Sequence, residues 1–370
     1  MARSAKPRHP ATLASLAAEL GVSRTTVSNA YNRPDQLSPE LRRRVLETAR
    51  RLGYPGPDPV ARSLRTRQAG AVGLLLTEAL SYAFRDPAAI GFLEGLATAC
   101  EEAGQGLLLV PASPEADQLR TAAAVHRAGV DGFVVYSVPD DDPHLAAVLE
   151  RPLPTVICDQ PHIDGVGHVG IDDHAAMAEV GNHLIEHGHH AIGVICMRLC
   201  TDRHDGPVDV THQQQARFHV QRARLAGLAE AFGAVLMDWS AVPVVERFDH
   251  TVASGASAAA QLLDSDPSLT ALVCTSDILA LGALEEVRRR GLRVPDDLTV
   301  TGFDGVPEAQ RAGLTTVRQP IREKGHAAGR LLLDRAEPAR RRVVSLPTEL
   351  VVGTSSGPAK KRDAPWFSGL

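Results

Sequence analysis

Apolar residues recur at helical spacing in three short stretches near the start of the chain. In "TLASLAAEL" (12–20), leucine and alanine return every three or four residues, which places them on one face of a helix. Gly21 ends this stretch, and Ser23 and Ser38 stand where two further helices would begin, because a serine hydroxyl caps the free N–H groups of a helix start. The pattern predicts three short helices around a small core. The expected inner positions are Leu13, Leu16, Ala17 and Leu20, then Val27, Ala30 and Tyr31, then Leu41, Val45, Ala49 and Leu52.

From residue 70 the pattern changes to short unbroken apolar runs that alternate with helical stretches rich in Ala, Leu and Glu. Runs without polar interruption are typical of parallel strands that are buried on both faces. The region is long for one such sheet, so we expect two stacked α/β lobes. The expected strands are 71–76, 106–110, 132–136, 154–159, 191–196, 242–246, 271–275 and 298–304, and the expected helices include 89–103, 115–128, 173–187, 254–264 and 277–290.

A proline-rich segment separates these two textures. "YPGPDP" (54–59) contains three prolines in six residues and indicates a domain boundary. We therefore expect a disordered basic arm at 1–10, a helical head at 11–57, a short linking helix at 58–67, a body at 68–353 and a disordered tail at 354–370.

The charge is distributed unevenly between these regions. Residues 1–67 hold thirteen Lys and Arg against five Asp and Glu; of the totals of 39 and 44, the rest of the chain therefore holds 26 and 39. A basic head on an acidic body suggests that the head binds a polyanion. The apolar content of 44% is enough for a core, whereas aromatic residues make up only 4%.

The sequence also bears on the compartment. The basic start "MARSAKPRHP" has no apolar segment of the secretory type behind it, and no apolar run reaches the roughly 18 residues that a membrane span needs. Three of the five cysteines, Cys158, Cys196 and Cys274, lie in apolar strand-like runs. We expect reduced, buried thiols in a cytoplasmic protein without a membrane partner.

The second expected helix has an unusual outer face. With Ser23 as its cap, Arg24, Thr25, Ser28 and Asn29 fall opposite the apolar side. A guanidinium, two hydroxyls and an amide on a short helix suit the major groove, where Arg pairs with guanine and Asn with adenine. Helix, glycine turn and polar-faced helix form the helix-turn-helix arrangement. The alternative is a solvated helix in an ordinary small bundle.

The linking segment could also contact DNA. Val60, Ala61 and Leu64 share one side of the helix expected at 59–66, with arginines nearby. Some proteins insert apolar side chains flanked by arginine into the minor groove. A plain linker explains the same residues equally well.

Several specific runs occur together and in order along the chain. They include "TLASLAAELGVSRTTVSNAYN" in the head and "VPDDLTVTGFDG" and "LTTVRQP" in the body. With these runs the sequence resembles the lac repressor family (LacI/GalR) of bacterial transcription regulators over residues 11–353. The resemblance implies an all-α helix-turn-helix head and an α/β two-lobed body like the periplasmic binding proteins, with two doubly wound parallel sheets. It implies lobes at 70–173 with 305–333, and at 174–304 with 334–353.

The resemblance also implies a function. The chain would be a sequence-specific DNA-binding regulator, a repressor, whose affinity for its operator depends on a small effector bound between the lobes. The implied partners are a pseudo-palindromic double-stranded operator, a sugar-like polyhydroxyl effector and a second copy of the chain. No cofactor and no enzymatic activity are implied.

Residue roles follow from the matched positions. The resemblance implies base contacts by Arg24, Thr25 and Asn29, and contacts to the DNA backbone or support of the helix by Ser23, Thr26, Ser28 and Asn32. In the hinge it implies a minor-groove wedge at Leu64, with Ala61 and Arg65 beside it.

The effector site is expected at the carboxyl ends of the strands, where ligands bind in open α/β sheets. Polar residues at these ends are Asp159, Ser276, Asp277 and Asp304, and Asp277 could instead cap the helix that follows it. The resemblance adds Arg224 and Gln319, and it places His250 where relatives often have an aromatic side chain. The resemblance implies no effector contacts for the loop 198–221, because this loop is longer than the corresponding connection usual in the family.

An enzyme is the alternative from another class. "HLIEH" (183–187) matches a zinc-binding pattern, and Cys196, Cys200, His204, Asp205 and His212 form a looser group, so a metal-dependent hydrolase with an accessory DNA-binding head is conceivable. No third ligand is evident in the helix, and Cys196 is expected to end a buried strand. "GVGHVG" (165–170) lacks the strand-to-helix context of a dinucleotide site and is interpreted as a turn before a short strand.

Overall fold

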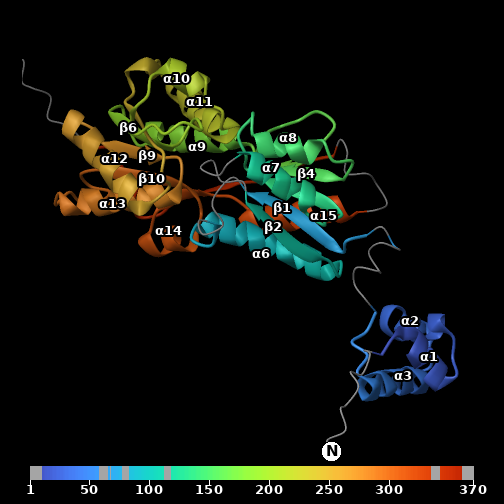
Figure 1. Ribbon diagram of the computed structural model, residues 1–370. Helices are drawn as coiled ribbons and strands as arrows, with labels where there is room; N and C mark the ends of the chain where they lie inside the picture. The colour runs from blue at the N-terminus through green and yellow to red at the C-terminus, as the bar shows by residue number, and fades with distance from the viewer. Residues whose placement is uncertain are drawn as a thin grey trace, which may run out of the picture. The chain divides into compact units, whose positions relative to one another are not determined.

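The structure, a computed structural model, describes residues 11–57, 66, 68–76, 83–111, 118–334 and 342–360. The chain forms two compact units, Met1–Ala69 and Gly70–Leu370 (Figure 1). The expected arm at 1–10 and the hinge positions Ala61, Leu64 and Arg65 lie outside the described residues.

The head consists of three helices, as predicted. They are α1 (Leu13–Leu20), α2 (Arg24–Asn32) and α3 (Pro39–Leu52), with a 3-10 turn η1 (Pro34–Gln36) before the last. Ser23 Oγ accepts a hydrogen bond from the Thr26 N–H at 3.0 Å, and Ser38 Oγ accepts one from the Leu41 N–H at 3.3 Å, so both serines cap their helices. Gly21 and Gly53 adopt the left-handed conformation that ends α1 and α3. The core consists of Leu16, Ala17, Val27, Ala30, Val45 and Ala49.

The first lobe of the body is built on a six-stranded parallel sheet. Its strands run in the order β12-β5-β4-β3-β1-β2, which is the order expected of a doubly wound sheet with crossover helices. The strands are β1 (Ala71–Leu76), β2 (Gly106–Pro111), β3 (Gly132–Tyr136), β4 (Thr155–Cys158), β5 (Gly167–Gly170) and β12 (Val343–Ser345). Helices α6 (Pro87–Glu102), α7 (Gln118–Arg127), α8 (Pro143–Leu149) and α15 (Ile321–Leu333) belong to this lobe.

The second lobe contains a seven-stranded sheet in the order β13-β11-β10-β9-β6-β8-β7. Its central strands are parallel, and β13 and β7 pair antiparallel at the two edges. The strands are β6 (Ile192–Met197), β7 (Gly206–Pro207), β8 (Val244–Arg247), β9 (Ala271–Cys274), β10 (Thr299–Asp304), β11 (Thr315–Arg318) and β13 (Glu349–Val351). The helices are α9 (Asp173–Glu186), α10 (Val210–Gln214), α11 (His219–Ala234), η2 (Trp239–Ala241), α12 (Val252–Ser265), α13 (Asp277–Arg289) and α14 (Pro307–Ala312).

The chain passes between the lobes at places that differ from the expected ones. The segment 307–318 was expected in the first lobe, but β11 pairs with β10 and therefore belongs to the second. Conversely, β12 pairs with β5 in the first lobe. Both strands are short and partly polar, so their burial pattern gives no clear signal along the sequence.

The expected disordered tail also begins too early. The Ser355 N–H donates to the Gly313 carbonyl at 3.0 Å, and the Val300 N–H donates to the Ser355 carbonyl at 2.9 Å. Lys360 Nζ lies 2.9 Å from Asp297 Oδ1. Residues 354–360 are therefore packed on the second lobe, and the prediction of disorder is wrong for them.

Close helix packing in the first lobe yields a stability prediction. A Cβ added at Gly95 in α6 would meet the backbone carbonyl of Arg322 in α15, whose carbonyl carbon lies 2.9 Å away. Gly95→Ala should therefore lower the free energy of unfolding by about 1–3 kcal/mol, because two packed backbones must separate. Gly233 in α11 has no atom within 4 Å of an added Cβ, so Gly233→Ala should be neutral or stabilising by up to about 1 kcal/mol. Urea unfolding of the full chain would contradict the packing argument if both variants behaved alike.

Candidate functional site

The outer face of α2 is polar and accessible. Arg24 and Thr25 are exposed, Ser28 and Asn29 are half-buried, and Val27 and Ala30 face the core as predicted. Asn29 Nδ2 donates a hydrogen bond to Gln36 Oε1 at 3.1 Å, so η1 restrains the amide. Short polar side chains allow the helix to approach base edges closely, which is the geometry of major-groove reading.

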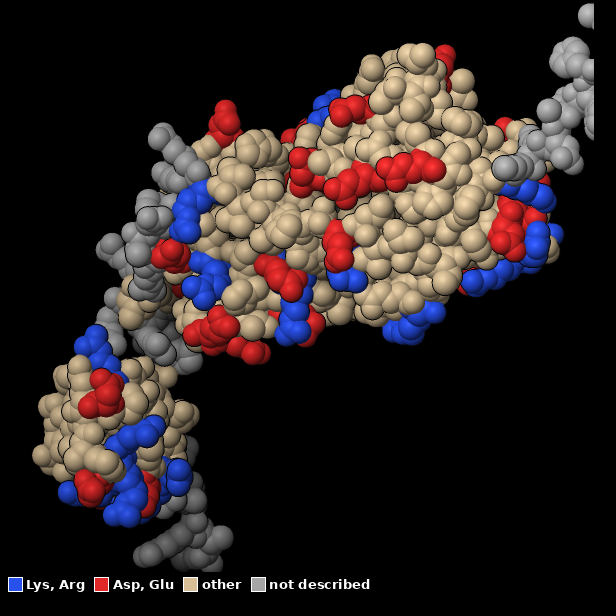
Figure 2. All heavy atoms as spheres, turned by 180° about the vertical axis from the view of Figure 1, so that it is seen from behind, with Lys and Arg blue, Asp and Glu red and all other residues tan. Residues whose placement is uncertain are grey.

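The residues predicted to contact the DNA backbone form hydrogen bonds at the two ends of α2, and these hydrogen bonds stabilise the helix. They are Ser23, Thr26, Ser28 and Asn32. Ser23 Oγ and Thr26 Oγ1 lie 2.9 Å apart at its start. Asn32 Nδ2 donates to the Ser28 carbonyl at 3.0 Å and to Ser28 Oγ at 3.1 Å near its end. Within 11–57 the head carries seven arginines against four acidic residues, and Figure 2 shows basic side chains on its surface.

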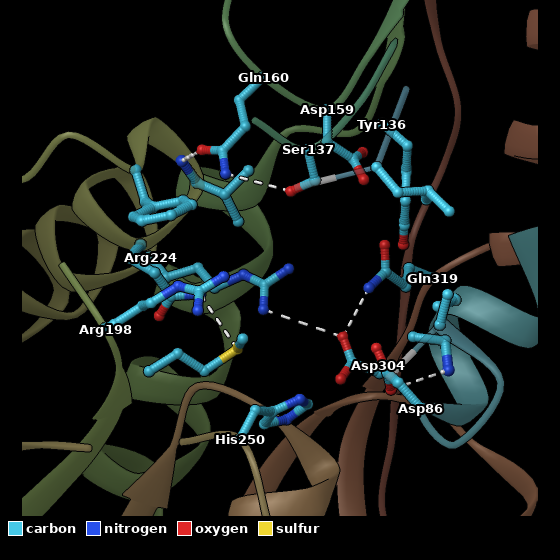
Figure 3. Close-up of a pocket in the computed structure, with 18 residues that line it drawn as sticks. Asp86, Tyr136, Ser137, Asp159, Gln160, Arg198, Arg224, His250, Asp304 and Gln319 are labelled. Atoms are coloured by element: carbon cyan, nitrogen blue, oxygen red, sulfur yellow. Dashed lines mark hydrogen bonds and ion pairs between the residues drawn. The ribbon is translucent and has the colours of Figure 1, made fainter. Parts of the chain in front are cut away.

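The body holds a cavity between its two lobes, at the carboxyl ends of the strands. It encloses about 860 Å³ of empty space, its open mouth included. The first lobe contributes residues that follow β3 and β4 and the start of α6, and the second contributes residues that follow β6 and β8 and the start of α11 (Figure 3). Five predicted effector residues line it: Asp159, Arg224, His250, Asp304 and Gln319.

Asp159 is held by a buried lysine that the sequence did not indicate. Lys324 Nζ lies 2.7 and 2.8 Å from the two carboxylate oxygens of Asp159, and 2.6 Å from Gln319 Oε1. Burial alone would lower the pKa of Lys324, but the attraction of Asp159 raises it, so the ammonium remains charged. Asp159 is thus paired before any ligand binds.

Asp304 lies at the end of β10, next to the residues that cross between the lobes. Gln319 Nε2 donates to Asp304 Oδ1 at 2.6 Å, and Arg224 Nη1 lies 3.9 Å from the same oxygen. Burial raises the pKa of Asp304 to about 6, although Arg224 opposes the shift. Asp304 has φ +123°, and Asp159 and Ser137 in the same lining have φ +66° and +53°. Such strained backbone in non-glycine residues is concentrated at functional sites.

Arg224 is fixed from three sides. Its Nε donates to Asp173 Oδ1 at 2.8 Å, and its Nη1 donates to the Thr275 carbonyl at 2.6 Å. The guanidinium carbon lies 3.6 Å from the centre of the Phe303 ring. The side chain is therefore preorganised, which lowers the entropic cost of ligand binding.

His250 lines the cavity as an uncharged side chain. Burial lowers its pKa to about 4, although Asp304 opposes the shift, so the imidazole is neutral at physiological pH. Its Nε2 lies 2.7 Å from Ser276 Oγ, which also accepts a hydrogen bond from the Leu279 N–H at 3.3 Å.

Two of the predicted effector residues do not reach the cavity. Ser276 is fully buried behind His250 and caps α13, so the cap is Ser276 and not Asp277. Asp277 accepts hydrogen bonds from the Val306 N–H at 2.9 Å and from Thr316 Oγ1 at 2.6 Å. It therefore holds β11 and the loop after β10. A polar residue after a strand can begin a helix as readily as it can face a ligand, and the sequence does not distinguish the two.

Sequence reasoning missed several lining residues. From the first lobe they are Asp86, Tyr136, Ser137 and Gln160, and from the long loop and the start of α11 they are Arg198, Phe218, Val220 and Gln221. Arg198 directly follows β6, so the rule that found Asp159 would have found it too. Asp86 and Pro87 form a helix-start signal that was not connected with the site.

The long loop also joins the two lobes at the edge of the cavity. The Val220 N–H donates to Gln160 Oε1 at 2.7 Å, and the Asp140 N–H donates to the Arg217 carbonyl at 3.0 Å. Arg222 Nη2 lies 3.5 Å from Asp140 Oδ2. These contacts hold the two walls of the cavity together on one side.

The described residues give no support to a metal site. Within the described ranges there is no group of three or more His, Cys, Asp or Glu side chains that could hold a metal ion. His183 Nε2 lies 2.9 Å from Ser356 Oγ, and His187 Nδ1 lies 2.7 Å from the His183 carbonyl, so both rings of "HLIEH" contact the protein itself. All five cysteines are free, and Cys158, Cys196 and Cys274 are buried as expected.

Among the residues that the structure describes, no helix combines the length and the apolar character that a bilayer span requires.

Known proteins share both the sequence and the fold. A periplasmic binding protein-like domain matches residues 182–356. The HTH-type transcriptional regulator Rv3575c of Mycobacterium tuberculosis is 55% identical over 96% of this chain and 99% of its own length. A LacI family transcriptional regulator from Corynebacterium glutamicum has 42% identity and a TM-score of 0.72 over 94% of this chain and 99% of that one. The CelR–cellobiose complex has 30% identity and a TM-score of 0.68 over 94% of this chain and 100% of that one.

Head, cavity and relatives agree with the resemblance found in the sequence. The chain belongs to the lac repressor (LacI) family, the DNA-binding transcriptional regulators that a small effector controls through a two-lobed body.

Proposed function

We propose that the chain is a homodimeric repressor of the bacterial cytoplasm that releases or binds a pseudo-palindromic operator according to the level of a compact polyhydroxyl metabolite. The observation that carries the effector class is the opposition of charges across the cavity. Asp86 and Asp304 face Arg198 and Arg224 from opposite sides (Figure 3).

A hydroxyl group fits both sides of this cavity. It donates a hydrogen bond to a carboxylate and accepts one from a guanidinium, so a ligand with several hydroxyls pairs with all four charged groups at once. The cellobiose in the CelR complex supports a sugar-like ligand for this chain.

In the head, α2 is the proposed reading element. Arg24, Thr25 and Asn29 would contact base edges, and Ser23, Thr26, Ser28 and Asn32 would hold the backbone or the helix itself. The hinge roles of Ala61, Leu64 and Arg65 rest on the resemblance alone. Each head of a dimer would read one half of the operator.

The proposal predicts a reciprocal link between the two ligands. If the effector changes the affinity for DNA, DNA must change the affinity for the effector by the same factor. A thermal-shift screen of the full chain with sugars, linear and cyclic polyols and nucleobases tests the effector class. Each hit is then titrated into a complex of the chain with operator DNA selected from random sequences. If only nucleobases bind, or if hits leave DNA affinity unchanged, the proposal fails.

A substitution in α2 tests direct base reading. Asn29→Ala should relax the preference at one position of each half-site, because a bidentate Asn–adenine pair contributes about 1–3 kcal/mol of discrimination. Competition against operators with single-base changes measures this. The control is Arg51→Ala, an exposed residue of α3 paired with Glu19, which should leave base preference unchanged. A uniform loss of affinity on every sequence for Asn29→Ala would remove its assignment as a base contact.

The raised pKa of Asp304 gives a pH prediction. Hydroxyl groups bind the carboxylate, so effector affinity should fall as the pH drops through the pKa of Asp304. One pH unit below the pKa of about 6, affinity should be about tenfold weaker. His250 does not titrate in this window, because its pKa is about 4. Calorimetric titrations between pH 5 and 8 on wild type and Asp304→Asn check the assignment. The variant should bind weakly at every pH, and an unchanged pH profile in it would contradict the role of Asp304.

A further inference from the structure

The long loop 198–221 contributes a residue to the cavity that neither the resemblance nor the relatives assign. We propose that Arg198, held between Phe218 and Phe248, is a specificity-determining contact that binds adjacent hydroxyl groups of the effector. This inference rests on the proposed polyhydroxyl effector and names the group that would recognise part of it.

The position of Arg198 is set by the end of a buried strand. It directly follows β6, and its side chain lines the cavity together with Phe218 and Gln221. Its guanidinium carbon lies 5.0 Å from the centre of the Phe218 ring and 5.3 Å from the centre of the Phe248 ring. Two aromatic contacts at these distances favour the cation and restrict its orientation.

Phe248 supports Arg198 without being part of the cavity lining. It follows β8 and is half-buried. The guanidinium of Arg203 lies 4.6 Å from the centre of the same ring, and its Nη1 and Nη2 lie 2.9 and 2.8 Å from the two carboxylate oxygens of Asp249. The loop therefore packs on the segment after β8 through Phe248. The two aromatic rings that hold Arg198 come from these two segments, Phe218 from the loop and Phe248 from the segment after β8.

The charge state of Arg198 suits a hydroxyl-binding role. Burial lowers the pKa of its guanidinium to about 10, although Asp249 opposes the shift, so the group stays charged at neutral pH. A planar guanidinium presents parallel N–H donors, which match two neighbouring oxygen atoms, whereas a lysine ammonium acts as a point charge. Replacement by lysine therefore separates geometry from charge.

A neutral ligand fits this cavity better than an anionic one. Asp86 and Asp304 line the same cavity as Arg198, and a phosphate or carboxylate would meet their repulsion. We therefore assign Arg198 to hydroxyl groups, and an anionic substituent is the outcome that would contradict the assignment.

The test combines changes in the protein with changes in the ligand. The probe is the strongest binder from a panel of neutral sugars and linear and cyclic polyols, and glucose 6-phosphate represents anionic ligands. Arg198→Lys should weaken binding of the probe by ten- to a hundredfold in calorimetry on the full chain. The reason is that lysine lacks the parallel N–H donors, so buried hydroxyl groups of the probe lose hydrogen-bond partners. The control is the same substitution at Arg288, which is exposed on α13 and should leave affinity within twofold of wild type.

Deoxy analogues of the probe identify the contact. When the analogue lacks a hydroxyl that Arg198 binds, its affinity for the wild type should be at least tenfold weaker than that of the probe. The Arg198→Met variant should bind the probe and this analogue with equal affinity. A purely structural role of Arg198 would weaken all analogues alike. Phe248→Leu should lower affinity severalfold through Arg198, and Phe248→Tyr should restore it. The melting temperature of Arg198→Lys should stay near the wild-type value.

The possible failures are distinguishable. If wild type binds no member of the panel, both the polyhydroxyl effector and the role of Arg198 are overturned. If wild type binds the probe and Arg198→Lys binds it equally, only the role of Arg198 is overturned. If glucose 6-phosphate binds more tightly than every neutral compound, and this advantage disappears in Arg198→Met, Arg198 recognises an anion and the assignment to hydroxyls is wrong.

Discussion

A buried lysine charge imposes the main constraint on the effector cavity. Lys324 is 1% exposed, and an ammonium in such a place is tolerated only with close partners, because its desolvation costs several kcal/mol. Asp159 and Gln319 provide these partners, and Gln319 in turn donates to Asp304. The end of β4 in the first lobe, the crossing segment and the end of β10 in the second lobe are thereby tied into one chain of polar contacts. Removal of the Asp159 carboxylate would leave the buried Lys324 ammonium without its counter-charge, at a cost of about 3–5 kcal/mol.

These linked contacts also fix the positions of the proposed ligand-binding groups in both lobes. One carboxylate oxygen of Asp304, Oδ1, accepts a hydrogen bond from Gln319 and also lies 3.9 Å from Arg224 Nη1. A hydroxyl group that binds Asp304 would therefore change the contacts that connect the two lobes. On the opposite wall, the long loop contacts the first lobe through Val220 and Arg217. An effector with different affinities for two lobe arrangements would shift the balance between them, which is the physical requirement for control of DNA binding.

The sequence predicted those parts of the structure that depend on local periodicity. β1 and β3 were found to the residue because their apolar runs are unbroken, and the three head helices were found because serine and glycine mark their ends. β11 and β12 were not found, because short strands at or near a sheet edge carry mixed side chains and owe their pairing to distant partners. Likewise, Asp159 and Asp277 look alike in sequence, each following an apolar run. Only the fold shows that one faces the cavity and the other ties β11 to α13.

Lys324 and Arg198 show a further limit of sequence reasoning. Lys324 lies in an amphipathic helix, where a lysine normally indicates solvent, and its burial follows from a carboxylate 165 positions earlier in the chain. The orientation of Arg198 depends on two phenylalanines that reach it from the far end of the loop and from the segment after β8. The fold decides which partners surround a charged side chain. The burial of Lys324 and the orientation of Arg198 could therefore be described only once those partners were known. The polar face of α2 is the opposite case, because its proposed partner is outside the protein and its side chains must stay short and accessible. That face could therefore be predicted from helix periodicity alone, whereas the contacts that orient the charged groups of the cavity required the fold.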